Sequence, residues 1–157
     1  MDKLTGPMVA ECSTWLSIVS KLFGTRMGVL LEPHGLTQGQ FSILHHIVRQ
    51  GSDSGSRVSE IAAAVEVEQP AVTKTLAKFQ NMGLVEMTTS PRDKRAKLVK
   101  ATPQAGPLLG KIYEDIGPDL FQVFSALEVS EVERFTQQLK AVGQWLDTNR
   151  LSSQRPK

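Results

Sequence analysis

The hydrophobic positions of this chain repeat mostly at helical spacing. Over residues 8–31 an apolar residue recurs every three or four positions, which predicts a long amphipathic helix. A second helix is predicted over 37–49, where Thr37 and Gln40 have the spacing of a capping box. The intervening turn formers of 51–56, GSDSGS, then predict a loop.

The middle of the chain changes from helical to alternating patterns. Two short helices are predicted, over 58–65 and 70–82; the second starts with a proline, which suits a first turn, and stops at Gly83. Two strands are predicted over 84–88 and 96–101, with a polar loop rich in turn formers between them. This segment therefore predicts a helix pair followed by a β-hairpin.

The C-terminal third reads as helical again. Thr102 is the predicted N-cap of a helix that continues toward Phe124, with a kink or break at Gly117-Pro118. Ser130-Glu131-Val132-Glu133 is a predicted capping box that opens a last helix, and residues 149–157 form a predicted flexible tail. The last helix has an apolar seam with 3-4 spacing, which needs a partner helix: Val132, Phe135, Leu139, Val142 and Leu146.

The pattern predicts a mainly α protein with a small β-hairpin, an α+β winged helix-turn-helix core between helical extensions. We divide it into an N-terminal helix (1–35), the winged core (36–101), C-terminal helices (102–148) and the tail (149–157). Trp15, Val19 and Leu22 of the first helix are further candidates for helix–helix contact between chains.

Composition narrows the class of protein. The 157 residues are 40% hydrophobic and 22% charged, an ordinary composition for a folded protein with one core. No apolar run is long enough to span a membrane, and the N-terminus has no pattern of a signal peptide. Cys12 is the only cysteine, which excludes an internal disulfide and is typical of a cytoplasmic protein.

Positive charge is concentrated in one segment. The chain has a net charge of +2, yet residues 69–100 contain seven basic and two acidic side chains, a local charge of +5. The remainder of the chain is therefore at −3. A basic cluster on a neutral-to-acidic body is expected of a protein that binds nucleic acid, although a solvated surface would show the same counts.

The predicted helix over 70–82 has two different faces. Val72, Leu76 and Phe79 share one side and are expected to pack inward. Small and basic residues share the other side, which suits close approach to a double helix: Pro70, Ala71, Thr73, Lys74, Ala77, Lys78 and Asn81. Gln69, Thr73 and Lys74 are the candidates for contact with base edges, and Lys78 for contact with phosphate.

The loop of the predicted hairpin is the second candidate site. Its charged residues are Arg92, Asp93, Lys94, Arg95 and, at the next strand, Lys97. The four cations among them suit contact with a phosphate backbone. The alternative is an exposed ion pair between Asp93 and Arg95 that contributes little.

The order and spacing of these motifs resemble the MarR family of bacterial regulators over residues 36–106. The matching positions are Leu36-Thr37-x-x-Gln40-Phe41-x-x-Leu44, Val58-Ser59-Glu60-Ile61-Ala62, Val72-Thr73-Lys74-x-Leu76, Gly83-Leu84-Val85, Asp93-x-Arg95, Thr102 and Gly106.

The resemblance implies a homodimer in which the first and last two helices intertwine and two winged lobes bind a pseudo-palindromic duplex. By position, Arg95 would enter the minor groove and Asp93 would orient it. The resemblance also implies a transcriptional regulator, expected to be a repressor, that a small aromatic or amphipathic acid bound between lobe and dimer helices would release. No cofactor is expected.

Three other interpretations stay open. Cys12 could sense oxidants, as in one branch of the family, although it falls on the apolar stripe, where a thiol is usually buried and inert. A winged helix could instead serve protein contact. His45 and His46 point about 100° apart on a helix, so joint metal binding is disfavoured, and His45 is the weak candidate for lining a ligand pocket. No catalytic motif is present, so no enzyme is predicted.

Overall fold

The protein, described by a computed structural model over residues 3–51 and 54–151, is mainly helical. Parts of the predicted loop 51–56 and of the predicted tail, residues 52–53 and 152–157, lie outside the described residues. The elements in chain order are α1 (Gly6–Leu31), the 3₁₀ turn η1 (Glu32–His34), α2 (Gln38–Gln50), β1 (Ser56–Arg57), α3 (Val58–Val65), α4 (Gln69–Asn81), β2 (Val85–Thr89), β3 (Lys97–Ala101), α5 (Ala105–Val123) and α6 (Val129–Thr148).

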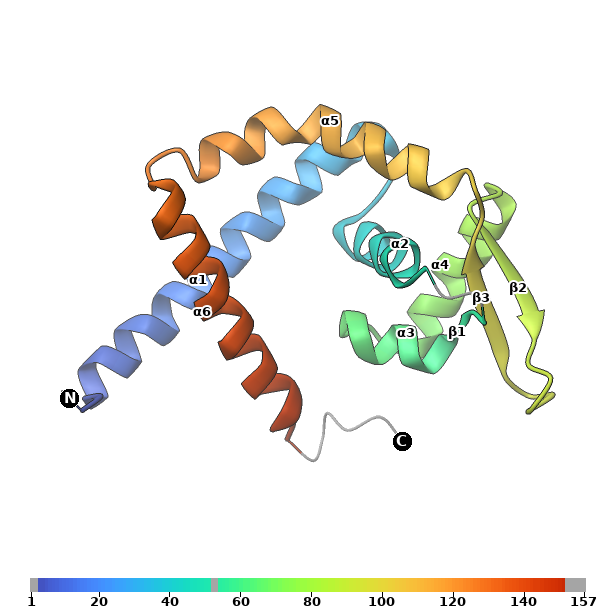
Figure 1. Ribbon diagram of the computed structural model, residues 1–157, viewed down its shortest axis with the longest axis horizontal. Helices are drawn as coiled ribbons and strands as arrows, with labels where there is room; N and C mark the ends of the chain where they lie inside the picture. The colour runs from blue at the N-terminus through green and yellow to red at the C-terminus, as the bar shows by residue number, and fades with distance from the viewer. Residues whose placement is uncertain (1–2, 52–53, 152–157) are drawn as a thin grey trace.

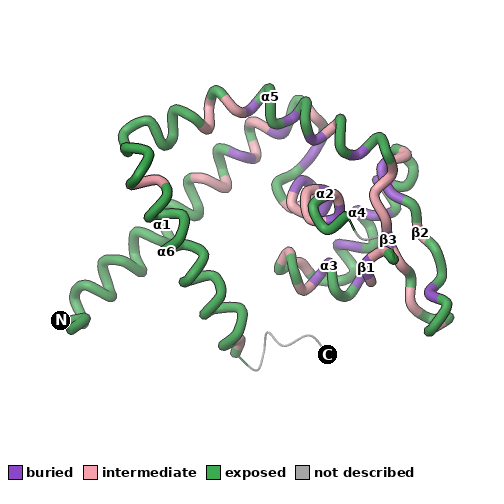
Figure 2. Tube along the Cα trace, viewed as in Figure 1, coloured by how far each residue is buried: buried purple, intermediate pink, exposed green. Residues whose placement is uncertain are grey.

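The elements form one lobe and a set of projecting helices (Figure 1). Helices α2, α3 and α4 gather against the sheet, α5 runs across the top, and α1 and α6 project away from the sheet. Figure 2 shows buried residues concentrated in the lobe and where α1 meets α5, whereas α6 and the N-terminal half of α1 are exposed. The fold class predicted from the pattern is confirmed.

The core of the lobe is built from one face of each of its helices. Phe79, Leu76 and Val72 of α4 are completely buried, as the helical spacing predicted. Helix α2 contacts α1, α3, α5 and β3, so it buries more than one stripe. Ile43 and Ile47 are therefore buried together with Phe41 and Leu44.

The sheet has three strands, where the sequence predicted two. β3 lies in the centre, pairing with β2 from Val85↔Ala101 to Thr89↔Lys97 and with β1 at Ser56↔Val99. The two-residue β1 was missed because it is short, polar and directly precedes α3. It fixes the start of α3 to the sheet.

Two side-chain contacts join α5 to α1 and to the turn η1. The Arg26 guanidinium binds Asp119 through both carboxylate oxygens, with Nη2 and Oδ2 2.6 Å apart, and this hydrogen bonding lowers the pKa of Asp119. His34 Nε2 lies 3.5 Å from Asp115 Oδ2, one helical turn earlier on α5. The C-terminal half of α5 is thus fixed to the end of α1 and to η1.

The predicted start of the fifth helix is wrong. α5 begins at Ala105, after Gln104, and Thr102 does not cap it. The Thr102 hydroxyl instead donates to the carbonyl of Gly83 at 2.6 Å. Gly83 follows α4 with φ +71°, so Thr102 connects the end of β3 to the turn that ends α4.

Two further predictions about the C-terminal helices need correction. No break occurs at Gly117-Pro118, because α5 runs through Pro118 to Val123. Pro118 and Glu114 are both exposed, so water can bind the carbonyl that the proline leaves unpaired. The N-cap of α6 is Glu128 rather than Ser130, and the Glu131 carboxylate accepts from the Glu128 amide at 3.0 Å.

The Thr102 contact makes a prediction about stability. Thr102→Val removes the donor to the part-buried Gly83 carbonyl and should lower the free energy of unfolding by about 1–2 kcal/mol. The matched control is Thr136→Val, whose exposed hydroxyl bonds within α6, with an expected change below about 0.5 kcal/mol. Denaturant unfolding at one fixed protein concentration measures both, and equal values would refute the role of Thr102.

Candidate nucleic-acid interface

Helix α4 presents a small and partly basic face to solvent. Its N-cap, Glu68, makes no side-chain cap, and Gln69 and Pro70 form the first turn. The candidate residues of its first half are all exposed: Gln69, Pro70, Ala71, Thr73 and Lys74. The Thr73 hydroxyl donates to the Gln69 carbonyl at 2.9 Å. The buried and exposed sides of α4 are thus those that the spacing predicted.

Lys78 makes contacts within the lobe that its sequence pattern did not predict. Its ammonium donates to the Gly35 carbonyl at 2.7 Å and to Gln40 Oε1 at 3.0 Å. Gln40 Oε1 also accepts from the Thr37 amide at 3.2 Å, within the capping box of α2. Lys78 therefore ties α4 to the start of α2, and its contact with phosphate stays a prediction.

The loop between β2 and β3, residues 90–96, is closed by local hydrogen bonds. Buried Ser90 donates its amide to the Ala96 carbonyl at 2.9 Å, and its hydroxyl accepts from the Arg92 amide at 3.3 Å. Ala96 donates in turn to the Asp93 carbonyl at 2.9 Å. We call residues 85–101 the wing, and its tip exposes the side chains of Arg92, Lys94 and Arg95.

Asp93 contacts the backbone of Arg95 rather than the Arg95 guanidinium. Its Oδ1 accepts from the Arg95 amide at 3.0 Å. Its Oδ2 lies 3.9 Å from Nη1 of Arg57, so its ion pair is with Arg57 and not with Arg95, the pair named above as the alternative to DNA contact. Arg57 precedes α3, and its amide donates to Glu60 Oε2 at 2.8 Å. Sequence patterns gave no signal for Arg57, because its partner lies 36 positions along the chain.

Several cations of α4 and the wing have no acidic partner. Lys74, Arg92, Lys94 and Arg95 are exposed, and no carboxylate in the described parts of the chain lies within ion-pair distance of them. Lys97 donates to the Thr89 hydroxyl at 2.9 Å across the β2–β3 pair. Unpaired cations beside small side chains suit the binding of a polyanion.

The structure places His45 in an aromatic cluster. Its ring stacks on Phe41 with centroids 6.1 Å apart, and the Tyr113 ring of α5 meets both edge-on. Burial raises the pKa of Tyr113. The pKa of His46 is lowered, mainly by burial and to a smaller extent by the nearby His45 and Arg49. An open concavity of about 350 Å³ lies beside this cluster, lined by Phe41, Ser42, His45, His46, Arg49, Ala64, Val65 and Glu66.

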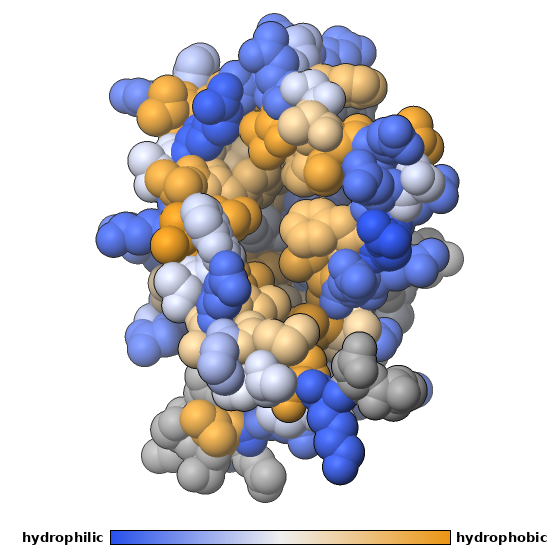
Figure 3. Space-filling model, turned by 90° about the vertical axis from the view of Figure 1, so that its left-hand side faces the viewer, coloured by the Kyte–Doolittle hydropathy of each residue, from blue (hydrophilic) through white to orange (hydrophobic). Residues whose placement is uncertain are grey.

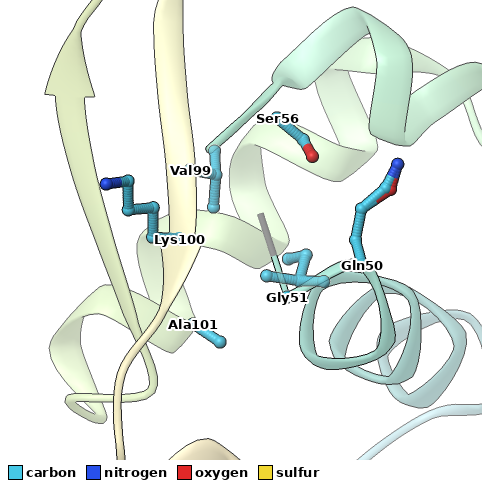
Figure 4. A pocket seen from close by; sticks show the side chains of 7 residues that line it. Gln50, Gly51, Ser56, Val99, Lys100 and Ala101 are labelled. Atoms are coloured by element: carbon cyan, nitrogen blue, oxygen red, sulfur yellow. The ribbon is translucent and has the colours of Figure 1, made fainter. Parts of the chain in front are cut away.

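A second, smaller cavity lies between the end of α2 and the sheet (Figure 4). It measures about 200 Å³, and Ser56 and Gln50 border it with Val99. The ammonium of Lys100 points away from this cavity in Figure 4.

The remaining candidate features are the single cysteine, a metal site and a membrane span. Cys12 is exposed on α1, where burial was expected of a thiol on the apolar stripe. Among the described residues no three His, Cys, Asp or Glu side chains gather in a way that could hold a metal ion. None of the described helices combines the length and apolar character needed to cross a bilayer.

The projecting helices expose many apolar side chains (Figure 3). Figure 3 shows apolar side chains gathered on this side of the molecule around a hollow. Trp15, Val19 and Leu22 of α1 are 58%, 50% and 65% exposed. The predicted seam of α6 is exposed at Phe135, Leu139, Val142 and Leu146, with Val132 half-buried, and Trp145 beside it is exposed as well. We call this the helical face.

Comparison with known proteins agrees with this geometry. Residues 34–96 match the family model described as MarR family. A transcriptional regulator (MarR family) from Rhodococcus sp. RHA1 has a TM-score of 0.75 at 20% identity, over 88% of this chain and 96% of that one. The M. tuberculosis transcriptional regulator MOSR in complex with DNA has a TM-score of 0.65 at 26% identity, over 89% of this chain and 98% of that one. CouR from Rhodococcus jostii RHA1, bound to p-coumaroyl-CoA, has a TM-score of 0.69 at 21% identity, over 83% of this chain and 90% of that one.

The wing geometry makes a prediction about local order. Asp93→Ala removes the acceptor of the Arg95 amide and the partner of Arg57, so the protection of that amide against hydrogen exchange should fall by roughly fivefold or more. Glu86→Ala, an exposed carboxylate on β2, is the control and should leave it unchanged. NMR-detected exchange measures both, and equal protection in the two variants would contradict the role of Asp93.

Proposed function

We propose that the chain is a dimeric, sequence-specific regulator of transcription of the MarR family that binds duplex DNA, because residues 34–96 match that family's model and the fold is similar to that of its solved members. The observation that carries the proposal is the two-sided α4. One side is wholly buried at Val72, Leu76 and Phe79, and the other is exposed, small and basic. MOSR, a relative of the same fold, was solved in complex with DNA.

In this proposal α4 lies in the major groove. The groove is about 12 Å wide and admits one helix. Pro70 and Ala71 allow a close approach because their side chains are short. Gln69 and Lys74 supply donors for adenine and guanine, and the Thr73 methyl group suits contact with thymine. Their place in the first half of α4 is where recognition helices contact base edges.

The wing would bind the DNA beside α4. Arg95 is proposed to enter the minor groove, with Asp93 holding its backbone and Arg57 holding Asp93. Arg92, Lys94 and Lys97 would lie near phosphates, which position a protein on DNA without reading its sequence. Lys78 stays a candidate for phosphate contact, although its ammonium is bound within the lobe.

The helical face is proposed to be the dimer interface. Apolar side chains exposed along both α1 and α6 are unfavourable in a monomer, and a second copy would cover them. For both α4 helices of such a dimer to enter successive major grooves, they must lie about one turn of DNA apart, roughly 34 Å. A pseudo-palindromic site follows from the two-fold symmetry of such a dimer.

A repressor released by a small ligand is the finer part of the proposal. CouR, of similar fold, is bound to p-coumaroyl-CoA. Here the concavity beside Phe41, His45 and Tyr113 offers aromatic rings together with Arg49, which suits an aromatic acid. Such a ligand would act by favouring a dimer whose α4 helices no longer match the DNA spacing.

Different residues should affect DNA binding in different ways. Arg95→Ala should weaken binding to every duplex, whereas Gln69→Ala or Lys74→Ala should reduce discrimination at one base pair by about 1–3 kcal/mol. The measurement is fluorescence anisotropy on a duplex selected by the wild-type protein from a random pool, and on shuffled duplex. For the wild-type protein, log K should fall with log salt concentration by about 0.9 per phosphate contacted. Equal losses on both duplexes for all three variants would refute these roles.

The dimer can be tested on α6. Leu139→Asp places a charge in the helical face and should raise the dimer dissociation constant by about 100-fold or more. Gln137→Asp, an exposed residue on the opposite side of α6, is the matched control and should leave the dimer intact. Sedimentation velocity at micromolar concentration measures both. A wild-type monomer, or an unchanged mass for Leu139→Asp, would refute the interface.

A further inference from the structure

Helix α6 touches its own chain at its two ends. From Val129 to Asn149 only Glu131 and Val132, in its first turn, are part-buried. The next part-buried residue is Arg150, directly after the helix, and Figure 2 shows the exposed length between them. In the described residues, the far end of α6 is therefore held to the lobe through Arg150.

The Arg150 guanidinium binds acceptors from two elements. Its Nη2 forms ion pairs with Glu66 Oε1 and Asp147 Oδ1, and it donates to the Ala63 carbonyl at 3.4 Å. Its Nε lies 3.0 Å from Asp147 Oδ1. The side chain is only 20% exposed. Asp147, three residues earlier, holds the guanidinium in place for its contacts with α3.

Arg150 binds the last turn of α3. The Ala62 carbonyl there already accepts from the amides of Glu66 and Val67. Ala63 follows Ala62 in the last turn of α3, where helical amides run out, and Arg150 supplies a donor to its carbonyl. A cation is also favoured at a helix C-terminus because of the helix dipole.

Glu66 has an unusual backbone for its residue type. Its φ is +55°, the left-handed conformation that usually favours glycine, and no other non-glycine residue in the described ranges has a positive φ. A glycine there would relieve the backbone but would remove the carboxylate that Arg150 binds. The turn between α3 and α4 thus contains a strained residue whose side chain is used in a contact with α6.

We propose that Arg150 is a positioning residue that ties the end of α6 to the α3–α4 turn and so fixes α4 relative to the dimer helices. The inference rests on the proposed function, because it concerns how α4 is held for DNA. α4 begins three residues after Glu66, so a displacement of this turn moves its N-terminal residues. We call the Arg150–Glu66–Ala63 contact the clasp.

The two sides of the clasp have opposite charge, which separates positioning from simple electrostatics. Arg150→Ala removes a positive charge, and Glu66→Gln removes a negative charge close to the start of α4. If charge alone mattered, the first change would weaken DNA binding and the second would strengthen it. If the clasp positions α4, both changes weaken binding to the selected duplex, by roughly five- to tenfold.

The experiment measures affinity for three duplexes. One is selected by the wild-type protein from a random pool, and the others have one base pair added or removed at the centre. Wild-type protein should distinguish the three, and Arg150→Ala and Glu66→Gln should distinguish them less. Arg134→Ala, an exposed arginine on the same helix, is the matched control and should retain both affinity and spacing preference. All variants should remain dimers by sedimentation.

A second measurement checks the contact itself. Hydrogen exchange of the Glu66 and Val67 amides should become faster in Arg150→Ala and stay unchanged in Arg134→Ala. Unchanged exchange, or a Glu66→Gln protein that binds more tightly with its spacing preference intact, would overturn the clasp while leaving DNA binding in place. A wild-type protein that binds none of the duplexes would overturn the proposed function together with the inference.

Discussion

The burial of one face of α4 is the constraint on which the rest of the lobe depends. Val72, Leu76 and Phe79 have no solvent exposure, and burial of three such side chains contributes several kcal/mol, roughly 1.5–3 kcal/mol for each. Rotation of α4 about its axis would expose them, so the helix has one orientation. Its opposite side is then presented outward without any need for contacts of its own.

The elements around α4 are arranged to hold that orientation from several directions. Lys78 connects it to the loop before α2 and to the capping box of α2. Thr102 holds the glycine turn at its C-terminal end. Arg150 holds the turn before its N-terminal end. Each of these contacts joins segments more than eighteen residues apart, so each transmits the position of one element to another.

Sequence periodicity predicted the helices and their buried faces because these depend on neighbours three and four residues away. The capping box of Thr37 and Gln40 was predicted for the same reason and is present. The prediction for Thr102 was wrong because its hydroxyl bonds to a residue nineteen positions earlier. The contacts of Lys78 within the lobe were not predicted because a lysine on an exposed side shows no local sign of a distant carbonyl.

The candidate site was predictable in the same uneven way. The basic residues of α4 and the wing were apparent from composition and spacing. Arg57 and Arg150 were not, since each binds a carboxylate on another element, and a single sequence does not show such pairings. The strained Glu66 was also missed, because glutamate is rare at a helix end with positive φ.

The helical face has one practical consequence for spectroscopy. Both tryptophans of the chain, Trp15 and Trp145, lie on α1 and α6 and are exposed in the single chain, while the lobe contains neither. Intrinsic indole emission therefore reports the environment of the projecting helices alone. Association of these helices at high protein concentration would shift this emission to the blue. During titration with an optically silent duplex, the emission would still come from the two tryptophans of these helices.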